Sequence, residues 1–148
     1  ENLVIAGFPT RGATLARRLV NSIREVSGTY ADLAVIDTTM FRDDLASQPL
    51  RAPKETLIPV TGIDGRTVVL VDDVLYTGRT IKAALDALTR IGRPAAVQLA
   101  VLIDRGHREL PIRPDFVGKN LPTSRDETVT ILLDETDGRD GVLLGKGL

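Results

Sequence analysis

Short apolar runs, two of them followed by helical patterns, constrain the fold of this chain most strongly. The runs are continuous rather than alternating, which is typical of strands buried on both faces of a parallel sheet. Five such runs are present: Leu3 to Ala6, Leu33 to Ile36, Val68 to Val71, Leu99 to Ile103 and Val129 to Leu133. Strands that alternate with helices need crossover connections, so the sequence predicts an α/β fold with a parallel sheet.

Two segments between these runs have helical periodicity. Leu15, Leu19 and Ile23 recur at a spacing of four after the first run, which predicts an amphipathic helix. A clearer apolar stripe spans Ile81 to Ile91 after the third run, and Gly92 follows it as a typical stop signal.

Two other segments are rich in proline and have no periodicity. We expect Arg42 to Pro59 to form a long loop, with Ser47 to Thr56 as a flap that closes over the site. We expect Asp104 to Ser124 to form a small subdomain rather than more sheet, and we call it the hood. Residues 1–148 thus form one predicted domain, and the start without Met, almost inside a strand, suggests that upstream residues are absent from this sequence.

Composition excludes several classes of site. The 148 residues have a net charge of −1, no cysteine and one histidine. Disulfides, thiolate metal sites and multi-histidine zinc sites are therefore ruled out, and any metal is expected to be oxygen-bound magnesium. No apolar run is long enough for a membrane span and no signal peptide is visible, so we expect a cytoplasmic protein without membrane contact.

The segment from Val68 to Thr80 is the richest in chemistry. Its strand runs into Asp72 and Asp73, then a glycine-containing turn, then a helix. A helix N-terminus with hydroxyl donors from Thr77 and Thr80 binds phosphate, and adjacent carboxylates bind vicinal hydroxyls, so the pattern predicts a site for ribose 5-phosphate. An ordinary turn with two solvated aspartates is the alternative. Neither the P-loop motif nor the dinucleotide-binding glycine motif occurs in the chain.

This segment resembles the phosphoribosyl-pyrophosphate (PRPP) signature of the type I phosphoribosyltransferases. Three other segments, Arg42 to Leu45, Asp104 to Pro111 and Val117 to Ser124, resemble one subfamily, the pyrimidine operon regulatory proteins. The resemblance implies a central parallel sheet flanked by helices, with a flexible loop and a small hood.

The same resemblance implies two activities. One is the conversion of uracil and PRPP to UMP and pyrophosphate, with Mg²⁺ bound mainly through PRPP or pyrophosphate and no dedicated metal ligands in the protein. The other is binding of pyrimidine operon mRNA in response to UMP. The resemblance also implies a homodimer or homotetramer. The alternative is a hypoxanthine/guanine-type purine phosphoribosyltransferase that does not bind RNA.

Individual roles follow from the matched positions. Catalysis is assigned to Asp72, Asp73 and Arg105, although a surface ion pair is the alternative for Arg105. Tyr76 stands where purine enzymes carry an aspartate, which disfavours a purine base. Phe116 is expected to stack on the base, with core packing as its alternative. The expected substrate-binding residues are Thr10, Arg11 and Gly12 for pyrophosphate, and Arg42, Tyr76, Thr77, Gly78, Arg79, Thr80, Phe116 and Val117 for the remainder of the substrates.

Charge is segregated near the C-terminus. Residues 105–125 contain five cations against two acids, whereas residues 126–148 contain two cations against six acids. The basic stretch alone is compatible with a solvated surface. With the resemblance, it predicts RNA contacts by His107, Arg108, Arg113 and Lys119.

Overall fold

The computed structural model describes residues 2–38 and 56–146. Arg42 and all of the predicted flap except Thr56 lie outside the described residues. The elements in chain order are β1 (Leu3–Gly7), α1 (Arg11–Ser27), β2 (Asp32–Val35), β3 (Thr67–Leu75), α2 (Arg79–Ile91), β4 (Ala96–Asp104), β5 (Phe116–Asn120), β6 (Glu127–Leu132), α3 (Asp134–Asp137) and β7 (Gly141–Lys146).

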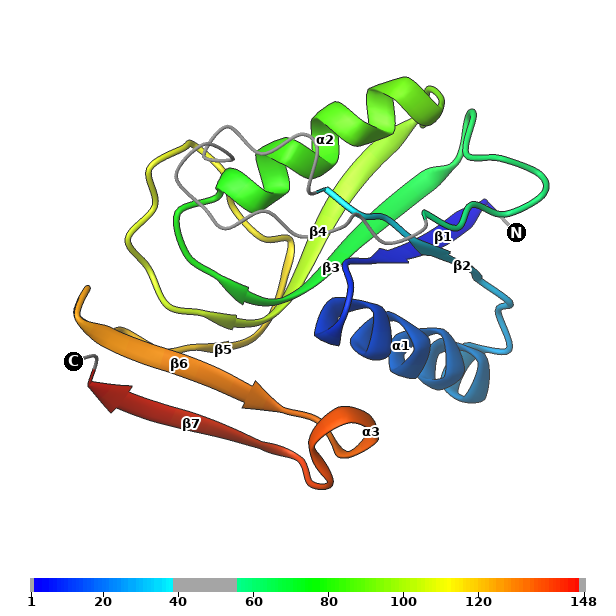
Figure 1. The fold of residues 1–148 in the computed structure, drawn as a ribbon. Coiled ribbons are helices and arrows are strands. Elements are labelled where there is room, and N and C mark those ends of the chain that lie inside the picture. Colours follow the sequence, from blue (N-terminus) through cyan, green and yellow to red (C-terminus); the bar gives the residue numbers. More distant parts are fainter. Residues whose placement is uncertain (1, 39–55, 147–148) are drawn as a thin grey trace.

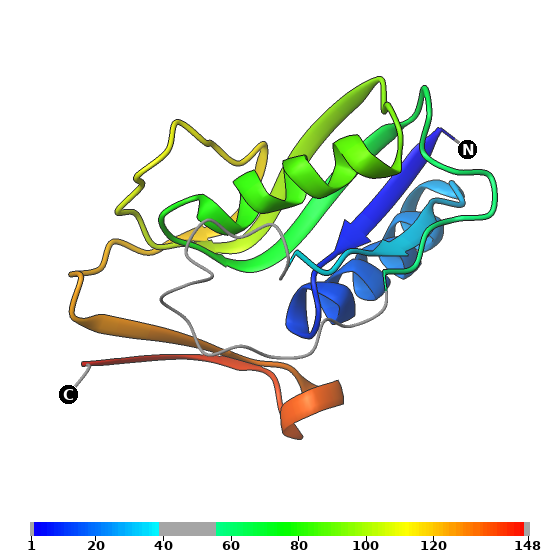
Figure 2. The same ribbon diagram turned by 45° about the horizontal axis from the view of Figure 1, so that its top comes forward.

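A five-stranded parallel sheet forms the centre of the molecule, in the order β2-β1-β3-β4-β5. Helices α1 and α2 cover opposite faces of it (Figures 1 and 2). Side chains alternate along β3 accordingly: Val68 and Leu70 pack in the cluster with α2, whereas Val69 and Val71 pack in the cluster with α1. A strand covered on both faces has no polar side, which explains its continuous apolar run.

The sequence correctly predicts both long helices and four of the five strands of this sheet. Two strand predictions differ from the structure. The run Val129 to Leu133 does not join the main sheet; it forms β6, which pairs antiparallel with β7. The fifth strand is instead β5, inside the predicted hood. Because β5 lies at the sheet edge and is mostly exposed, it has no apolar run that would identify it.

Strand β3 is also longer than expected, because it continues through Asp72 and Asp73 to Leu75. Its neighbour β1 ends at Gly7, opposite Val71. The last part of β3 therefore extends past β1 and pairs only with β4. The two acids still lie at the edge where β1 ends, although they do not follow the end of their own strand.

Strands β1 and β3 are neighbours, and the connections that follow them lead to opposite edges of the sheet. Strand β1 leads through α1 to β2, whereas β3 leads through α2 to β4. The carboxyl ends of β1 and β3 therefore flank a crevice of the kind in which open α/β sheets bind ligands. Close backbone contacts bring α1 to this crevice: a Cβ at Gly7 would lie 2.3 Å from the Gly12 carbonyl oxygen, and a Cβ at Gly12 would lie 2.7 Å from the Val71 carbonyl oxygen.

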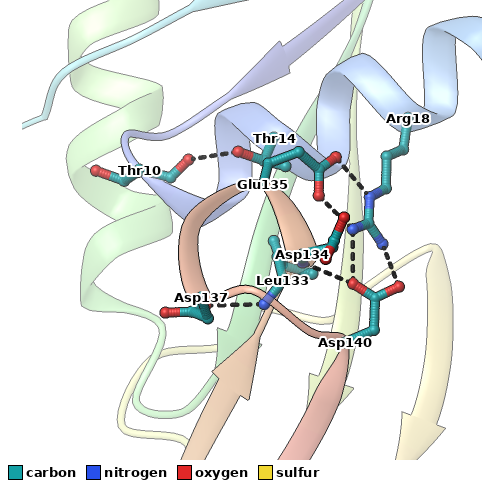
Figure 3. A network of polar contacts seen from close by, with 8 residues as sticks. All are labelled: Thr10, Thr14, Arg18, Leu133, Asp134, Glu135, Asp137 and Asp140. Carbon is teal, nitrogen blue, oxygen red and sulfur yellow. Dashed lines mark hydrogen bonds and ion pairs between the residues drawn. The ribbon is translucent and has the colours of Figure 1, made fainter.

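The C-terminal hairpin of β6 and β7 is attached to α1 by ion pairs (Figure 3). Arg18 donates to Glu135 from Nε at 2.9 Å and to Asp140 from Nη2 at 2.8 Å. Arg11 donates from Nη2 to Asp137 at 2.7 Å. Ile131 and Leu133 add a small apolar cluster with Ile103. A two-stranded sheet alone is marginal in water, so these contacts stabilise the hairpin.

Replacement of Gly7 by alanine tests the close approach of β1 and α1. The added methyl group would collide with backbone atoms of Gly12, so we expect the free energy of unfolding to fall by about 3 kcal/mol. Gly62 is the control, because it has a positive φ of 75° but nothing within 4 Å of an added Cβ. Gly62→Ala should cost about 1 kcal/mol in urea denaturation. Equal losses in the two variants would contradict the packing argument.

The hairpin contacts also predict acid sensitivity. Hydrogen bonds from Arg18 lower the pKa of Glu135 and of Asp140, and the Leu133 backbone N–H, followed by Arg11, lowers the pKa of Asp137. A lowered folded-state pKa stabilises the protein above the unfolded pKa of about 4, and this contribution is lost as the pH falls through the folded value. We expect Arg18→Met to lose less stability than the parent protein between about pH 5 and about pH 2 in thermal denaturation. Parallel pH profiles would exclude this linkage.

Candidate functional site

Asp72 and Asp73 lie in the extension of β3 at the crevice. Each carboxylate accepts a backbone N–H of the next residue: Asp73 N donates to Asp72 Oδ1 and Val74 N donates to Asp73 Oδ1, both at 2.8 Å. These bonds fix the orientation of both side chains, which are half-buried. The start of α1 lies directly against this position, because a Cβ at Gly12 would lie 3.6 Å from the Asp72 Cα atom.

A cavity of about 120 Å³ lies beside these acids, between the end of β3 and the start of α2. Gly78 is the N-cap of α2 and has a φ of 95°, a conformation that favours glycine. The Thr77 hydroxyl accepts the Arg79 backbone N–H at 3.3 Å, and a helix start of this kind presents backbone N–H groups and its positive dipole end to an anion. The cavity is lined by Asp72, Val74, Leu75, Tyr76, Thr77, Gly78, Thr80 and Ile81. It brings together five of the predicted substrate-binding or catalytic residues.

The predicted pyrophosphate residues form the start of α1, on the other side of the crevice. Thr10 is the N-cap and its side chain does not cap the helix, while Arg11 and Gly12 are the first helical residues. The Arg11 guanidinium donates to Asp137 of α3 at 2.7 Å. No sequence pattern indicates this partner, which lies 126 residues further along the chain.

Tyr76 is held between two residues of the hood. The Arg105 guanidinium lies over its ring, 4.3 Å from the centroid, and the His107 ring meets it edge-on with centroids 5.8 Å apart. The first is a cation–π contact and the second an edge-to-face ring contact, and both are favourable. The side chain of Tyr76, which is expected to disfavour a purine base, is therefore held by residues of the hood.

Arg105 and His107 are turned toward the protein rather than toward solvent. Arg105 is 8% exposed and donates to the Thr123 hydroxyl and to the carbonyl oxygens of Ser124 and Glu127. His107 Nε2 lies 2.5 Å from the Thr123 carbonyl oxygen. These contacts connect the hood to the start of β6. Arg105 and His107 therefore have a structural role, in addition to the catalytic and RNA-binding roles expected from the sequence.

Arg108 is also directed inward. It donates to the carbonyl oxygens of Ile112 and Tyr76, at 2.8 and 2.9 Å, and to the Asp104 carboxylate at 2.7 Å. Burial alone would raise the pKa of Asp104, but the hydrogen bonds from Arg108 and from the Gly106 backbone outweigh it, so the pKa of Asp104 is lowered. The expected free basic surface therefore does not include the Arg108 guanidinium.

Phe116 and Val117 are not brought to the cavity beside Tyr76. They begin β5, and the register places them level with the end of β1: Phe116 pairs with Ala100, which pairs with Val71, and Val117 pairs with Val101, which pairs with Asp72. Phe116 is 54% exposed and lines an apolar hollow of about 250 Å³ beside α1, which shares Asp72 with the cavity beside Tyr76. The expectation that Phe116 stacks on the base therefore stays a prediction, while its exposed ring argues against the alternative of plain core packing.

The remaining predicted residues lie at the surface. Arg113 and Lys119 are exposed. The Arg79 guanidinium donates to Glu109 at 2.9 Å, and its backbone N–H donates to the Thr77 hydroxyl. Sequence reasoning missed Asp104 and Asp137. Only Asp104 had a local signal, because it closes an apolar strand at the edge where ligands bind.

Metal and membrane features can be stated for the described residues. Across residues 2–38 and 56–146, no three histidine, cysteine, aspartate or glutamate side chains gather as a metal site. No helix in these ranges is long and apolar enough to cross a membrane.

Solved structures share this fold. A hypoxanthine-guanine phosphoribosyltransferase from Bacillus anthracis aligns over 99% of this chain and 80% of its own, with a TM-score of 0.64 and 17% identity. A hypoxanthine phosphoribosyltransferase from Staphylococcus aureus aligns over 82% and 63%, with a TM-score of 0.60 and 20% identity. At these identities the likeness concerns the fold alone.

Sequence comparisons are more specific. The family model for the phosphoribosyl transferase domain matches residues 1–130. A protein of Streptomyces coelicolor named "Bifunctional protein PyrR" is 62% identical over 98% of this chain and 75% of its own length. Proteins of the same name from Corynebacterium glutamicum and Mycobacterium tuberculosis are each 57% identical over 97% of this chain and 75% of theirs. The chain therefore belongs to the phosphoribosyltransferase family and, within it, to the bifunctional PyrR proteins.

Proposed function

We propose that this protein transfers the phosphoribosyl group of PRPP to uracil, which gives UMP and pyrophosphate, and that it regulates pyrimidine operon expression by binding mRNA in a UMP-dependent manner. The observation that carries the proposal is the crevice between β1 and β3. It has an uncapped helix start on one side, a small cavity at a second helix start on the other, and two fixed carboxylates beside them.

Each part of PRPP has a matching part of the crevice. The cavity at the start of α2, with Thr77, Gly78 and Thr80, suits the 5-phosphate, since backbone N–H groups and hydroxyls are donors to anions. Asp72 and Asp73 suit the ribose hydroxyls. The start of α1 at Thr10 to Gly12 suits pyrophosphate, for which both backbone N–H groups and the Arg11 side chain are donors.

The reaction breaks the bond from the anomeric carbon to pyrophosphate and forms a bond from that carbon to a uracil nitrogen, whose proton leaves to solvent or to the departing pyrophosphate. The sugar becomes cationic between these events, so the fixed carboxylates of Asp72 and Asp73 stabilise the charge that develops beside them. Tyr76, held by Arg105 and His107, borders the place of the base. A tyrosine at this position offers no carboxylate to a purine imidazole nitrogen, which favours the pyrimidine over the purine alternative.

Phosphoribosyltransferases as a family use Mg²⁺ with PRPP. Mg²⁺ is often held by one or two carboxylates together with substrate phosphates and waters. The adjacent Asp72 and Asp73 at the crevice fit such an ion, which when bound supplies charge neutralisation for the leaving pyrophosphate. We also propose that the protein acts in the cytoplasm, where PRPP and mRNA are found, as a homodimer or homotetramer.

The RNA contact is proposed for the exposed cations of the hood region. Arg113 and Lys119 are exposed, whereas Arg105 and Arg108 bind protein acceptors. A neutral protein with a local basic surface is suited to a specific rather than a general RNA contact.

The first test concerns catalysis. Asp73→Asn should lower the turnover of uracil and PRPP by about a hundredfold, because it removes a charge that acts on the transition state. Asp86→Asn is the control: Asp86 pairs with Lys82 on the exposed face of α2 and should leave the rate unchanged. Chromatography of the nucleotide formed from each free base measures both rate and specificity. Near-normal turnover of the Asp73 variant, or faster conversion of hypoxanthine than of uracil, would refute the assignment.

The second test concerns RNA. Arg113→Ala with Lys119→Ala should weaken binding of pyrimidine operon leader RNA in the presence of UMP, and should reduce the salt dependence of binding by up to about two units, one for each lost phosphate contact. Uracil conversion should not change. Arg93→Ala, a change of an exposed cation just before β4, is the control. Fluorescence anisotropy over a range of salt concentrations gives the slope, and an unchanged slope in the double variant would show that this surface is only solvated.

A further inference from the structure

Two arginines of α1 are bound by acids from one short segment, α3 and the turn after it. Arg11 and Arg18 are seven residues apart, which is close to two helical turns, so their side chains leave α1 on the same side. Arg18, near the middle of the helix, binds Glu135 and Asp140. Arg11, at the start of the helix and at the crevice, binds Asp137.

Asp137 is a fixed partner. Its Oδ1 atom accepts the Arg11 guanidinium at 2.7 Å and its Oδ2 atom accepts the Leu133 backbone N–H at 2.8 Å. The side chain is 17% exposed, compared with 49% for Glu135 and 59% for Asp140. These hydrogen bonds, the one from the Leu133 backbone first, lower the pKa of Asp137.

The Arg11 contact occupies only one end of the guanidinium. Within the described residues, Nε of Arg11 is buried and has no hydrogen-bond partner. A buried donor without a partner is costly, so the ion pair with Asp137 offsets part of the cost of placing Arg11 here. Arg11 is thus held from the hairpin side through Nη2, while its side chain as a whole remains 33% exposed.

We propose that Asp137 is a positioning residue for the pyrophosphate end of PRPP, acting through Arg11 and the helix start at Thr10 to Gly12. The proposal rests on the proposed phosphoribosyl transfer. A carboxylate this close to a binding site for an anion is unfavourable by charge alone. Its contribution is therefore geometric: it keeps the Arg11 side chain and the adjacent backbone N–H groups in place before PRPP binds.

A charge effect and a positioning effect of Asp137 predict opposite changes in pyrophosphate affinity, which makes the proposal testable. Removal of a negative charge near the crevice should tighten pyrophosphate binding if Asp137 acts only by its charge. Loss of positioning should weaken it. Asp137→Asn keeps an acceptor for the Leu133 N–H and removes the ion pair. Glu135→Gln removes the same charge from the same helix but contacts Arg18 instead of Arg11, so it is the matched control.

The experiment measures binding of magnesium pyrophosphate by calorimetry and steady-state kinetics with both substrates. Asp137→Asn should weaken pyrophosphate binding and raise the KM for PRPP by about tenfold, while the KM for uracil changes by less than about twofold. Glu135→Gln should leave pyrophosphate binding unchanged or tighten it slightly. In a protein that already carries Arg11→Met, the Asp137 substitution should have no further effect, because the two residues act as a pair.

Other outcomes overturn the proposal. Unchanged or tighter pyrophosphate binding in Asp137→Asn would show that this residue has no positioning effect. Equal effects of Asp137→Asn and Glu135→Gln would show that the contact only stabilises the hairpin. If Asp137→Asn does not fold, Arg11→Met must weaken pyrophosphate binding, and normal binding by that variant refutes the proposal. Pyrophosphate binding by a parent protein that does not convert uracil would contradict the proposed base but not the role of Asp137.

Discussion

The site depends on the close packing of the start of α1 against the ends of β1 and β3. Gly7 and Gly12 leave no room for a side chain between them, and Gly12 lies directly against the backbone of β3 at Val71. This contact sets the start of one helix beside Asp72, between the two neighbouring strands whose connections lead to opposite edges of the sheet. Without it, the two helix starts would not face one crevice, and the carboxylates between them would have no common ligand to bind.

Arginines connect the parts of the protein that surround this crevice. Arg105 joins the hood to the start of β6, and Arg11 and Arg18 join α1 to the turn of the same hairpin. A two-stranded sheet has too little apolar surface to be stable alone, which explains why its ends are attached by charged groups with planar, multiple donors. The hairpin therefore touches the crevice from two sides: near Tyr76 through Arg105 and near the helix start through Arg11.

The elements and site residues that could be predicted from the sequence are those whose pattern lies within a few neighbouring residues. The buried strands and both long helices have local apolar patterns, and the segment from Asp72 to Thr80 carries its chemistry within nine residues. Strand β5 escaped prediction because an exposed edge strand with glycine and lysine has no such pattern. The inward direction of Arg108 and the pairing of Arg11 with Asp137 escaped it because charge patterns do not show which distant partner a cation meets.

The hood couples the two proposed activities in one segment. Arg108 binds the Tyr76 carbonyl oxygen and Arg105 covers the Tyr76 ring, while the exposed Arg113 lies five residues further along the same segment. A nucleotide that changes the environment of Tyr76 therefore acts on the backbone that carries the exposed cation. By linkage, any factor by which UMP tightens RNA binding must equal the factor by which RNA tightens UMP binding. A regulator in which Tyr76 borders the base and Arg113 contacts RNA, as proposed, needs no second nucleotide site, because one segment both holds Tyr76 and carries Arg113.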